Sequence, residues 1–154
     1  MTYLDIIVKT GALIGPLCEI APGVTILEYT VVCTGVTLGK NAHIGEFVRL
    51  GNGCKVGNDS VIKCQAIVGP GCSVGKRVFV GPQAILLHGL PGDISIPSRV
   101  EDDAYIGAGA KVAPGVTIGR GVTLGALSYA RTDCLEPGLY VGCPARRVRR
   151  KEPC

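Results

Sequence analysis

The sequence has almost no large aromatic side chains. It contains no Trp and only two Phe in 154 residues, and aromatic residues make up 5% of the chain. A broad core built from large rings is therefore excluded. Glycine, in contrast, accounts for 23 residues, about twice its ordinary share. Such a chain needs a thin core of small and aliphatic side chains, with many tight turns.

Long apolar runs are also missing. Mean hydropathy is +0.37, yet no run approaches the roughly 20 residues of a membrane span. The opening stretch MTYLDIIVKTG lacks a basic region followed by a long apolar segment, so no signal peptide is predicted. We therefore expect a cytoplasmic protein without a membrane partner, and 154 residues suit a single domain spanning residues 1–154.

Metal-ligating patterns are scarce. The two histidines, His43 and His88, lie 45 positions apart, and no Cys-x-x-Cys pair occurs among the eight cysteines. A zinc site is therefore not predicted. Without a secretory signal the thiols are expected to stay reduced. Cys18, Cys54 and Cys72 are interpreted as small core residues.

Positive charge is concentrated at the C-terminus. The net charge of +4 comes from the stretch RRVRRK at 146–151, because the chain up to Ala145 holds 11 basic and 11 acidic residues. A tail this short does not indicate nucleic acid. Its guanidinium groups suit a small molecule that carries phosphates.

A six-residue repeat organises the first half of the chain. Branched aliphatic residues occupy every sixth position. They are Val8, Ile14, Ile20, Ile26, Val32, Leu38, Ile44, Leu50, Val56, Ile62, Val68, Val74, Val80 and Leu86. A period of six fits neither a helix nor a plain alternating strand.

The repeat predicts a coil with three flat sides. Each hexapeptide supplies one short strand with an inward anchor and one corner, so three hexapeptides complete an 18-residue coil. Successive coils stack at the strand spacing of about 4.8 Å, and this stacking buries the anchors. Cys54 and Cys72 are therefore expected to lie one above the other. His43 is expected at an exposed corner.

The repeat is interrupted in QAILLHGLPGDISIPS, residues 83–98. Leu86 and Val100 are 14 residues apart, two more than two hexapeptides. We predict a loop that leaves the coil at about 88–98, between coils at about 8–87 and 100–130, with a C-terminal segment at 131–154. Because a solenoid does not need such a loop for its stability, the loop and His88 are functional candidates.

The repeat resembles the hexapeptide-repeat superfamily over about residues 8–130. That resemblance implies an all-β, left-handed parallel β-helix with one extruded loop and a short C-terminal tail. The C-terminal pieces Gly125-Ala126, Pro137-Gly138 and Val141-Gly142-Cys143-Pro144-Ala145-Arg146 are similar to the acyltransferase branch. Members of this branch are typically homotrimers that bind acetyl-CoA between neighbouring coils. The resemblance nominates as acetyl-CoA-binding residues Gly107, Ala108, Gly125, Ala126, Pro144, Arg146 and Arg147.

The stretch VFVGPQAILLHG is similar to nucleotide-sugar N-acetyltransferases. This implies transfer of an acetyl group to the amine of a small polar acceptor, such as a nucleotide-linked amino sugar. His88 is the catalytic candidate, as a base, an acyl-positioning donor or an orienting residue. Substrate-binding candidates are Gln83, Asp93 and Tyr105.

Three alternatives remain on the sequence. The chain could acetylate a sugar or antibiotic hydroxyl, or serve as a non-catalytic β-helix interaction module. A γ-class carbonic anhydrase-like protein is disfavoured, because that class uses three histidines for zinc and this chain has two.

Overall fold

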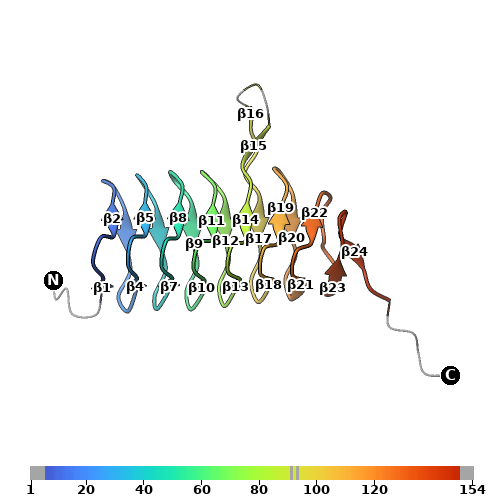
Figure 1. The fold of residues 1–154 in the computed structure, drawn as a ribbon, viewed down its shortest axis with the longest axis horizontal. Coiled ribbons are helices and arrows are strands. Elements are labelled where there is room, and N and C mark those ends of the chain that lie inside the picture. The colour runs from blue at the N-terminus through green and yellow to red at the C-terminus, as the bar shows by residue number, and fades with distance from the viewer. Residues whose placement is uncertain (1–5, 91, 93, 150–154) are drawn as a thin grey trace.

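The computed structural model describes residues 6–149 except 91 and 93. Over these residues it contains short strands and turns and no helix, which confirms the all-β prediction. Figure 1 shows an elongated solenoid with its first and last described strands, β1 (Ile7–Val8) and β24 (Arg146–Arg147), at opposite poles and one hairpin that projects from its side.

Three parallel sheets form the sides of the solenoid. Face A contains β1 (Ile7–Val8), β4 (Thr25–Ile26), β7 (His43–Ile44), β10 (Val61–Ile62), β13 (Phe79–Val80), β18 (Tyr105–Ile106), β21 (Val122–Leu124), β23 (Gly138–Val141) and β24 (Arg146–Arg147), of which only β24 runs antiparallel. Face B contains β2 (Leu13–Ile14), β5 (Val31–Val32), β8 (Arg49–Leu50), β11 (Ile67–Val68), β14 (Ile85–Leu86), β19 (Lys111–Val112) and β22 (Tyr129–Ala130). Face C contains β3 (Glu19–Ile20), β6 (Thr37–Leu38), β9 (Lys55–Val56), β12 (Ser73–Val74), β17 (Arg99–Val100) and β20 (Thr117–Ile118).

The strand register confirms the 18-residue coil. Ile7 pairs with Thr25, and Thr25 pairs in turn with His43, so each coil lies one period above the last. The result is a parallel β-solenoid of about seven turns, consistent with the left-handed β-helix of hexapeptide repeats. We name its edges the A–B, B–C and C–A corners after the faces they join. His43 lies on β7 in face A, so its predicted place at a corner is wrong.

The corners require an unusual backbone conformation. The third residue of a corner commonly has a positive φ, as at Gly53 (φ 66) and Asn41 (φ 57). Glycine and asparagine tolerate this region better than other residues, which accounts for part of the glycine content; at other corners, such as Gly57, a Cβ would strike the backbone of the next coil. Corner side chains also join coils: the backbone N–H of Lys40 donates to Oδ1 of Asn58 at 2.9 Å.

An ion-pair cluster joins three coils at the C–A corner. Asp103 contacts Arg77 at 2.6 Å and Arg120 at 3.1 Å. The hydrogen bond from the Arg77 guanidinium holds the pKa of the Asp103 carboxyl below its usual range. Because these side chains are solvent-exposed, the cluster contributes little to stability.

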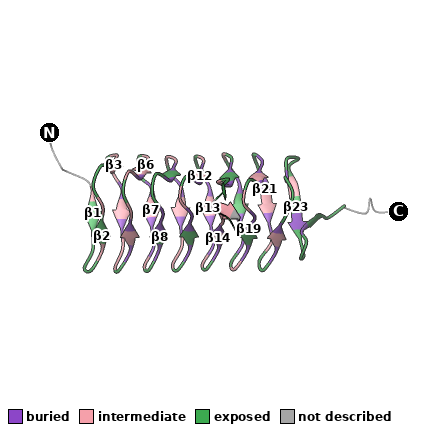
Figure 2. Ribbon diagram, turned by 90° about the horizontal axis from the view of Figure 1, so that it is seen from above, coloured by how far each residue is buried: buried purple, intermediate pink, exposed green. Residues whose placement is uncertain are grey.

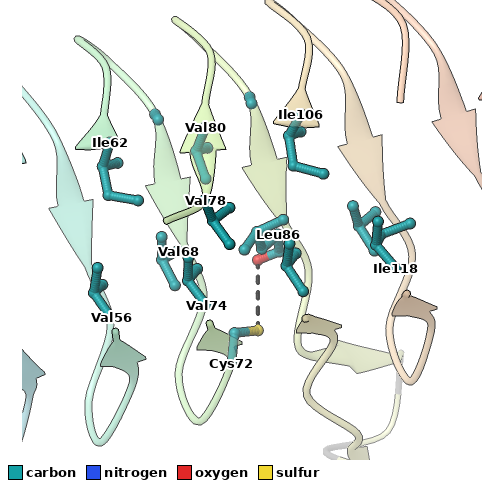
Figure 3. Close-up of a cluster of buried hydrophobic side chains, with 14 of the residues drawn as sticks. Val56, Ile62, Val68, Cys72, Val74, Val78, Val80, Leu86, Ile106 and Ile118 are labelled. Atoms are coloured by element: carbon teal, nitrogen blue, oxygen red, sulfur yellow. Dashed lines mark hydrogen bonds between the residues drawn. The ribbon is translucent and has the colours of Figure 1, made fainter. Parts of the chain in front are cut away.

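The predicted anchors form one continuous column inside the solenoid. Figure 2 shows buried residues lining the interior, and Figure 3 shows anchors of successive coils stacked on one another. Ile44, Leu86 and Ile106 are fully buried. The first coil is the exception to the predicted burial: Val8 is 47% and Ile14 is 40% exposed, because no described coil lies below them.

Cysteines gather on the inner side of the B–C corner. Cys54 and Cys72 are buried there and Cys18 is half-buried, whereas the buried Cys134 bridges to Ile118 on face C. The pairing of Lys55 with Ser73 sets Cys54 beside Cys72 in successive coils, as predicted. All seven cysteines of the described chain are free thiols. Burial raises the pKa of Cys54 to about 12.

When the pH is raised from 8 to 10.5, the Cys54→Ala variant is expected to lose less free energy of unfolding than the parent chain. The folded chain holds the thiol neutral, whereas the unfolded thiol ionises near its ordinary value of 9.0, so stability falls between these two pKa values. At pH 10.5 this loss is about 2 kcal/mol for one thiol. Urea unfolding at pH 8 and at pH 10.5 measures the free energy of unfolding of the parent chain and of each variant. Cys143→Ala, at an exposed thiol, is the control and should retain the full loss. An equal loss in Cys54→Ala and the parent chain contradicts the prediction.

The inserted segment is larger than the sequence arithmetic indicated. Before the insertion, pairs are offset by 18 residues, but Phe79 pairs with Tyr105, an offset of 26. Leu86 lies on face B and Val100 on the next face, so the 14-residue gap is one hexapeptide plus eight residues. The extruded loop itself is confirmed. It contains the antiparallel pair β15 (Gly89–Leu90) and β16 (Ile94–Ser95), which we call the hairpin.

The C-terminal segment continues the solenoid before it reverses. Cys134 bridges to Ile118, and β23 pairs in parallel with β21. Strand β24 then returns antiparallel to β23. Tyr140 and Ala145 are buried at this end, so the segment covers the last coil and is more than a tail.

Candidate functional site

The hairpin starts at His88 and is fixed at its root by hydrogen bonds. The backbone N–H of Ile96 donates to the His88 carbonyl at 2.7 Å, and the N–H of Ser98 donates to the Leu87 carbonyl at 3.2 Å. Below the root, the thiol of Cys72 lies 3.4 Å from the hydroxyl of the fully buried Ser98. The backbone of His88 is therefore held by the B–C corner independently of its side chain.

The His88 imidazole occupies space left free by a glycine. It is half-buried and lies over Gly69, where an added Cβ would be 2.9 Å from its Nδ1. Any side chain at position 69 would displace the ring. The coil below thus helps to set where the imidazole points.

A groove of about 510 Å³ extends from His88 down face B. It is lined by Cys33, Arg49, Gly51, Asn52, Ile67, Val68, Gly69, Pro70, Ile85, Leu86, Leu87 and His88. Its walls are mainly aliphatic, and its chemical groups are one guanidinium, one amide, one thiol and one imidazole. An apolar hollow with a few convergent polar groups is typical of a small-molecule site.

Two of the predicted acceptor-binding residues, Gln83 and Tyr105, lie outside this groove. Gln83 is exposed at the A–B corner, where its Nε2 donates to Oε1 of Gln65 at 2.8 Å. Tyr105 is on face A and stacks on Phe79, with ring centroids 4.9 Å apart. Asp93 lies outside the described residues.

Four of the residues nominated for acetyl-CoA, Gly107, Ala108, Gly125 and Ala126, lie at the A–B corner. Gly107 and Gly125 allow adjacent coils to approach closely, since a Cβ on Gly107 would strike the backbone of Ala126. Ala108 and Ala126 are exposed. Their backbone N–H groups have no acceptor within the described part of the chain. This edge therefore offers two backbone donors that are unpaired within the described residues.

The nominated C-terminal arginines differ in their surroundings. Nη1 of Arg147 donates to Oε2 of Glu136 at 2.7 Å, and its Nη2 donates to the Pro137 carbonyl at 2.7 Å. Arg146 is exposed, and its hydrogen bond goes to the neighbouring Ala145 carbonyl. Pro144 is exposed between them and the last coil. Arg146 is thus the freer cation, while Arg147 braces the C-terminal segment.

The two nominated halves of the site lie at opposite ends of face B. Strand β14 follows the A–B corner at 81–84 and leads into the B–C corner at Leu87 and His88. Ala108 and Ala126 belong to A–B corners, whereas His88 belongs to the B–C corner. A single chain therefore does not bring His88 together with Ala108 and Ala126.

Reasoning from the repeat missed the groove residues Arg49 and Asn52. Asn52 is two coils, or 36 residues, before His88 at the same corner position, and Arg49 is the outward residue of the strand that precedes it. Counting back from His88 in steps of 18 would have found Pro70 and Asn52.

No group of three or more His, Cys, Asp or Glu side chains suited to a metal occurs in residues 6–149, apart from the two positions not described. No helix in this part of the chain is long and apolar enough to span a membrane.

The fold and the groove define a hexapeptide-repeat β-solenoid with an extruded hairpin beside a ligand-sized hollow. The chain belongs to the bacterial transferase hexapeptide (six repeats) family, whose profile matches residues 18–52, 29–64, 53–88 and 97–129. A search of curated proteins finds no match.

Several solved structures share the fold. PerB from Caulobacter crescentus in complex with CoA and GDP-perosamine is 26% identical, with a TM-score of 0.68 over 89% of this chain and 58% of its own. WeeI from Acinetobacter baumannii AYE is 22% identical, with a TM-score of 0.67 over 90% and 56%. The acetyltransferase domain of PglB from Neisseria gonorrhoeae FA1090, in complex with acetyl coenzyme A, is 22% identical, with a TM-score of 0.64 over 91% and 58%. The chain thus spans less than three fifths of each.

Proposed function

We propose that this chain is an acetyl-CoA-dependent acyltransferase that acetylates the amine of a nucleotide-linked amino sugar. The observation that carries the proposal is the similarity to PerB, whose structure holds CoA and GDP-perosamine. The groove beside His88 supports it, because it has the size and the mixed lining of a small-molecule site. In this proposal residues 1–154 act as one acyltransferase domain.

The A–B corner fits the pantetheine arm and the acyl group of acetyl-CoA. Ala108 and Ala126 are exposed and have unpaired backbone N–H groups that can donate to amide or thioester carbonyls. Gly107 and Gly125 let the neighbouring coil and Val141 pack closely against this edge. Arg146 is available for a phosphate, whereas Arg147 would have to leave Glu136 to bind one. Pro144 would lie beside the bound molecule.

Acetyl-CoA supplies an activated acetyl thioester. His88 would accept the proton that the acceptor amine loses as its N–C bond to the acetyl carbon forms and the C–S bond breaks. The imidazolium can return that proton to the departing sulfur, so that the site ends the turnover in its starting state. A backbone N–H of the A–B corner would stabilise negative charge on the carbonyl oxygen.

The site requires a second copy of the chain. Because His88 and the Ala108–Ala126 edge lie at opposite ends of face B, they meet only if the B–C corner of one copy approaches the A–B corner of the next. Three copies arranged head to tail about one axis close such contacts into a homotrimer. The free thiols fit the reducing cytoplasm, where we place the reaction.

Isothermal calorimetry with CoA, and release of free CoA with a panel of acceptors, test the function. We expect CoA to bind and nucleotide-linked amino sugars to release thiol faster than the matching nucleotide sugars that carry only hydroxyl groups. Absence of CoA binding contradicts the acyltransferase proposal. Equal or faster release with hydroxyl acceptors would assign the chain to O-acetylation instead.

A further inference from the structure

Arg49 is an exposed cation without an acidic partner. It projects from β8 on face B, between Val31 and Ile67 of the neighbouring strands. Over the described residues every ion pair uses Asp103 or Glu136, and none includes Arg49. Its guanidinium therefore retains its full hydrogen-bonding capacity.

The groove around Arg49 holds no carboxylate. Its other polar side chains are those of Asn52 and His88, together with the thiol of Cys33. Asn52 already uses its Oδ1, which accepts the backbone N–H of Thr34 at 3.2 Å, so its amide N–H groups remain as donors. The polar groups of the groove are thus mainly donors, and a donor-rich groove with one cation matches an anion.

We propose that Arg49 and Asn52 bind the phosphate groups of a nucleoside diphosphate in this groove. Guanidinium groups hold phosphate oxygens in a two-point fork, and the amide of Asn52 can add a further donor. This inference rests on the proposed function only for the sugar attached to the diphosphate. The phosphate site itself depends on the groove alone.

The spacing along the solenoid suits such an acceptor. Arg49 pairs with Ile67, and Ile67 pairs with Ile85, so Arg49 lies two coils below the strand that leads into His88. Two coils correspond to about 10 Å. A diphosphate held at Arg49 would direct its sugar up the groove toward the imidazole.

The packing of a second copy strengthens the requirement for an anion. If a neighbouring chain covers face B, Arg49 becomes partly desolvated, and a buried cation without a counter-charge is strongly unfavourable. A phosphate group removes that penalty when it binds. The positive charge of Arg49 would therefore favour binding of the diphosphate part of the acceptor, in addition to the contacts made by its sugar.

Calorimetry with UDP and GDP tests the proposal without acetyl-CoA. We expect the parent chain to bind at least one of them, and Arg49→Gln to raise its Kd at least about tenfold. Arg49→Lys should retain part of the affinity, because it keeps the charge and loses the fork. Lys55→Gln is the matched control: it removes an exposed cation from face C of the same coil and should leave the Kd unchanged.

Calorimetry with inorganic phosphate and with the unphosphorylated nucleosides shows whether the affinity comes from the phosphate groups, from the nucleoside or from both. Binding of inorganic phosphate as tightly as the diphosphates would overturn the nucleoside part of the proposal. No binding of either diphosphate to the parent, or an unchanged Kd in Arg49→Gln, would overturn the site. Acetyl transfer is measured in parallel, so that the two proposals can fail separately. If the chain turns over but Arg49→Gln leaves the diphosphate Kd unchanged, only the phosphate site is refuted. If diphosphate binding depends on Arg49 but no acetyl transfer occurs, only the acetyl transfer is refuted.

Discussion

Replacing His88 with alanine is expected to lower kcat for acetyl transfer by about 10²- to 10⁴-fold, the range for removal of a general base. The groove lining contains one imidazole and no carboxylate, and histidine is the side chain that most often serves as a general base. CoA affinity should change little, because the proposed contacts to the pantetheine arm and the phosphates come from the A–B corner and Arg146, whereas His88 acts on the proton of the acceptor. Thiol release at saturating substrates measures kcat, and calorimetry measures CoA binding.

His43→Ala is the matched control for this variant. It removes the other histidine, which lies on β7 of face A, away from the groove. The hairpin should survive in His88→Ala, since the carbonyl of residue 88, and not its imidazole, accepts the N–H of Ile96. If the two variants have equal thermal unfolding midpoints, the lower kcat of His88→Ala is due to the missing imidazole and not to a less stable fold.

The pH profile distinguishes a proton acceptor from an orienting residue. If His88 takes the proton of the attacking amine, the deficit of His88→Ala should shrink as pH rises, because hydroxide can accept that proton in place of the imidazole. An orienting residue would give the same deficit at every pH. Normal turnover by His88→Ala at neutral pH would refute both roles.

The sequence predicts the fold well because the repeat is a local physical requirement. Each hexapeptide needs an inward anchor and a corner that accepts unusual φ values, and these demands recur in every coil. The size of the insertion was ambiguous for the same reason. The 14 residues from Leu86 to Val100 can be two hexapeptides plus two residues or one hexapeptide plus eight residues. Both divisions leave the anchors after the insertion in the same phase of the six-residue repeat. Only the pairing of Phe79 with Tyr105 decides between them.

The groove was not predictable from the motif that drew attention to His88. Arg49 and Asn52 occupy ordinary outward and corner positions, and nothing in their own hexapeptides marks them. They matter because stacking places them below His88, which is a relation over two coils. Arg147 shows the opposite case: a basic motif nominated it, but its guanidinium is engaged by Glu136 and the Pro137 carbonyl.

The separation of the two halves of the site has a direct consequence for mixed assemblies. His88→Ala removes the B–C corner half, whereas Ala126→Glu, at an exposed position, adds bulk and negative charge to the A–B corner half. Each variant alone should be nearly inactive. In a head-to-tail trimer that contains both variants, one of the three sites pairs an intact A–B corner with an intact His88.

Co-assembly of the two variants should therefore restore about a quarter of the parent activity, because about three quarters of randomly assembled trimers are mixed and each holds one intact site. Thiol release after co-expression measures the recovery. Mixing the separately assembled proteins, without subunit exchange, is the control and should restore nothing. If co-assembled variants show no more activity than the sum of the two alone, the site does not join the A–B corner of one chain to His88 of another. The acetyl-CoA edge would then have to be sought next to His88 on the B–C corner of the same chain.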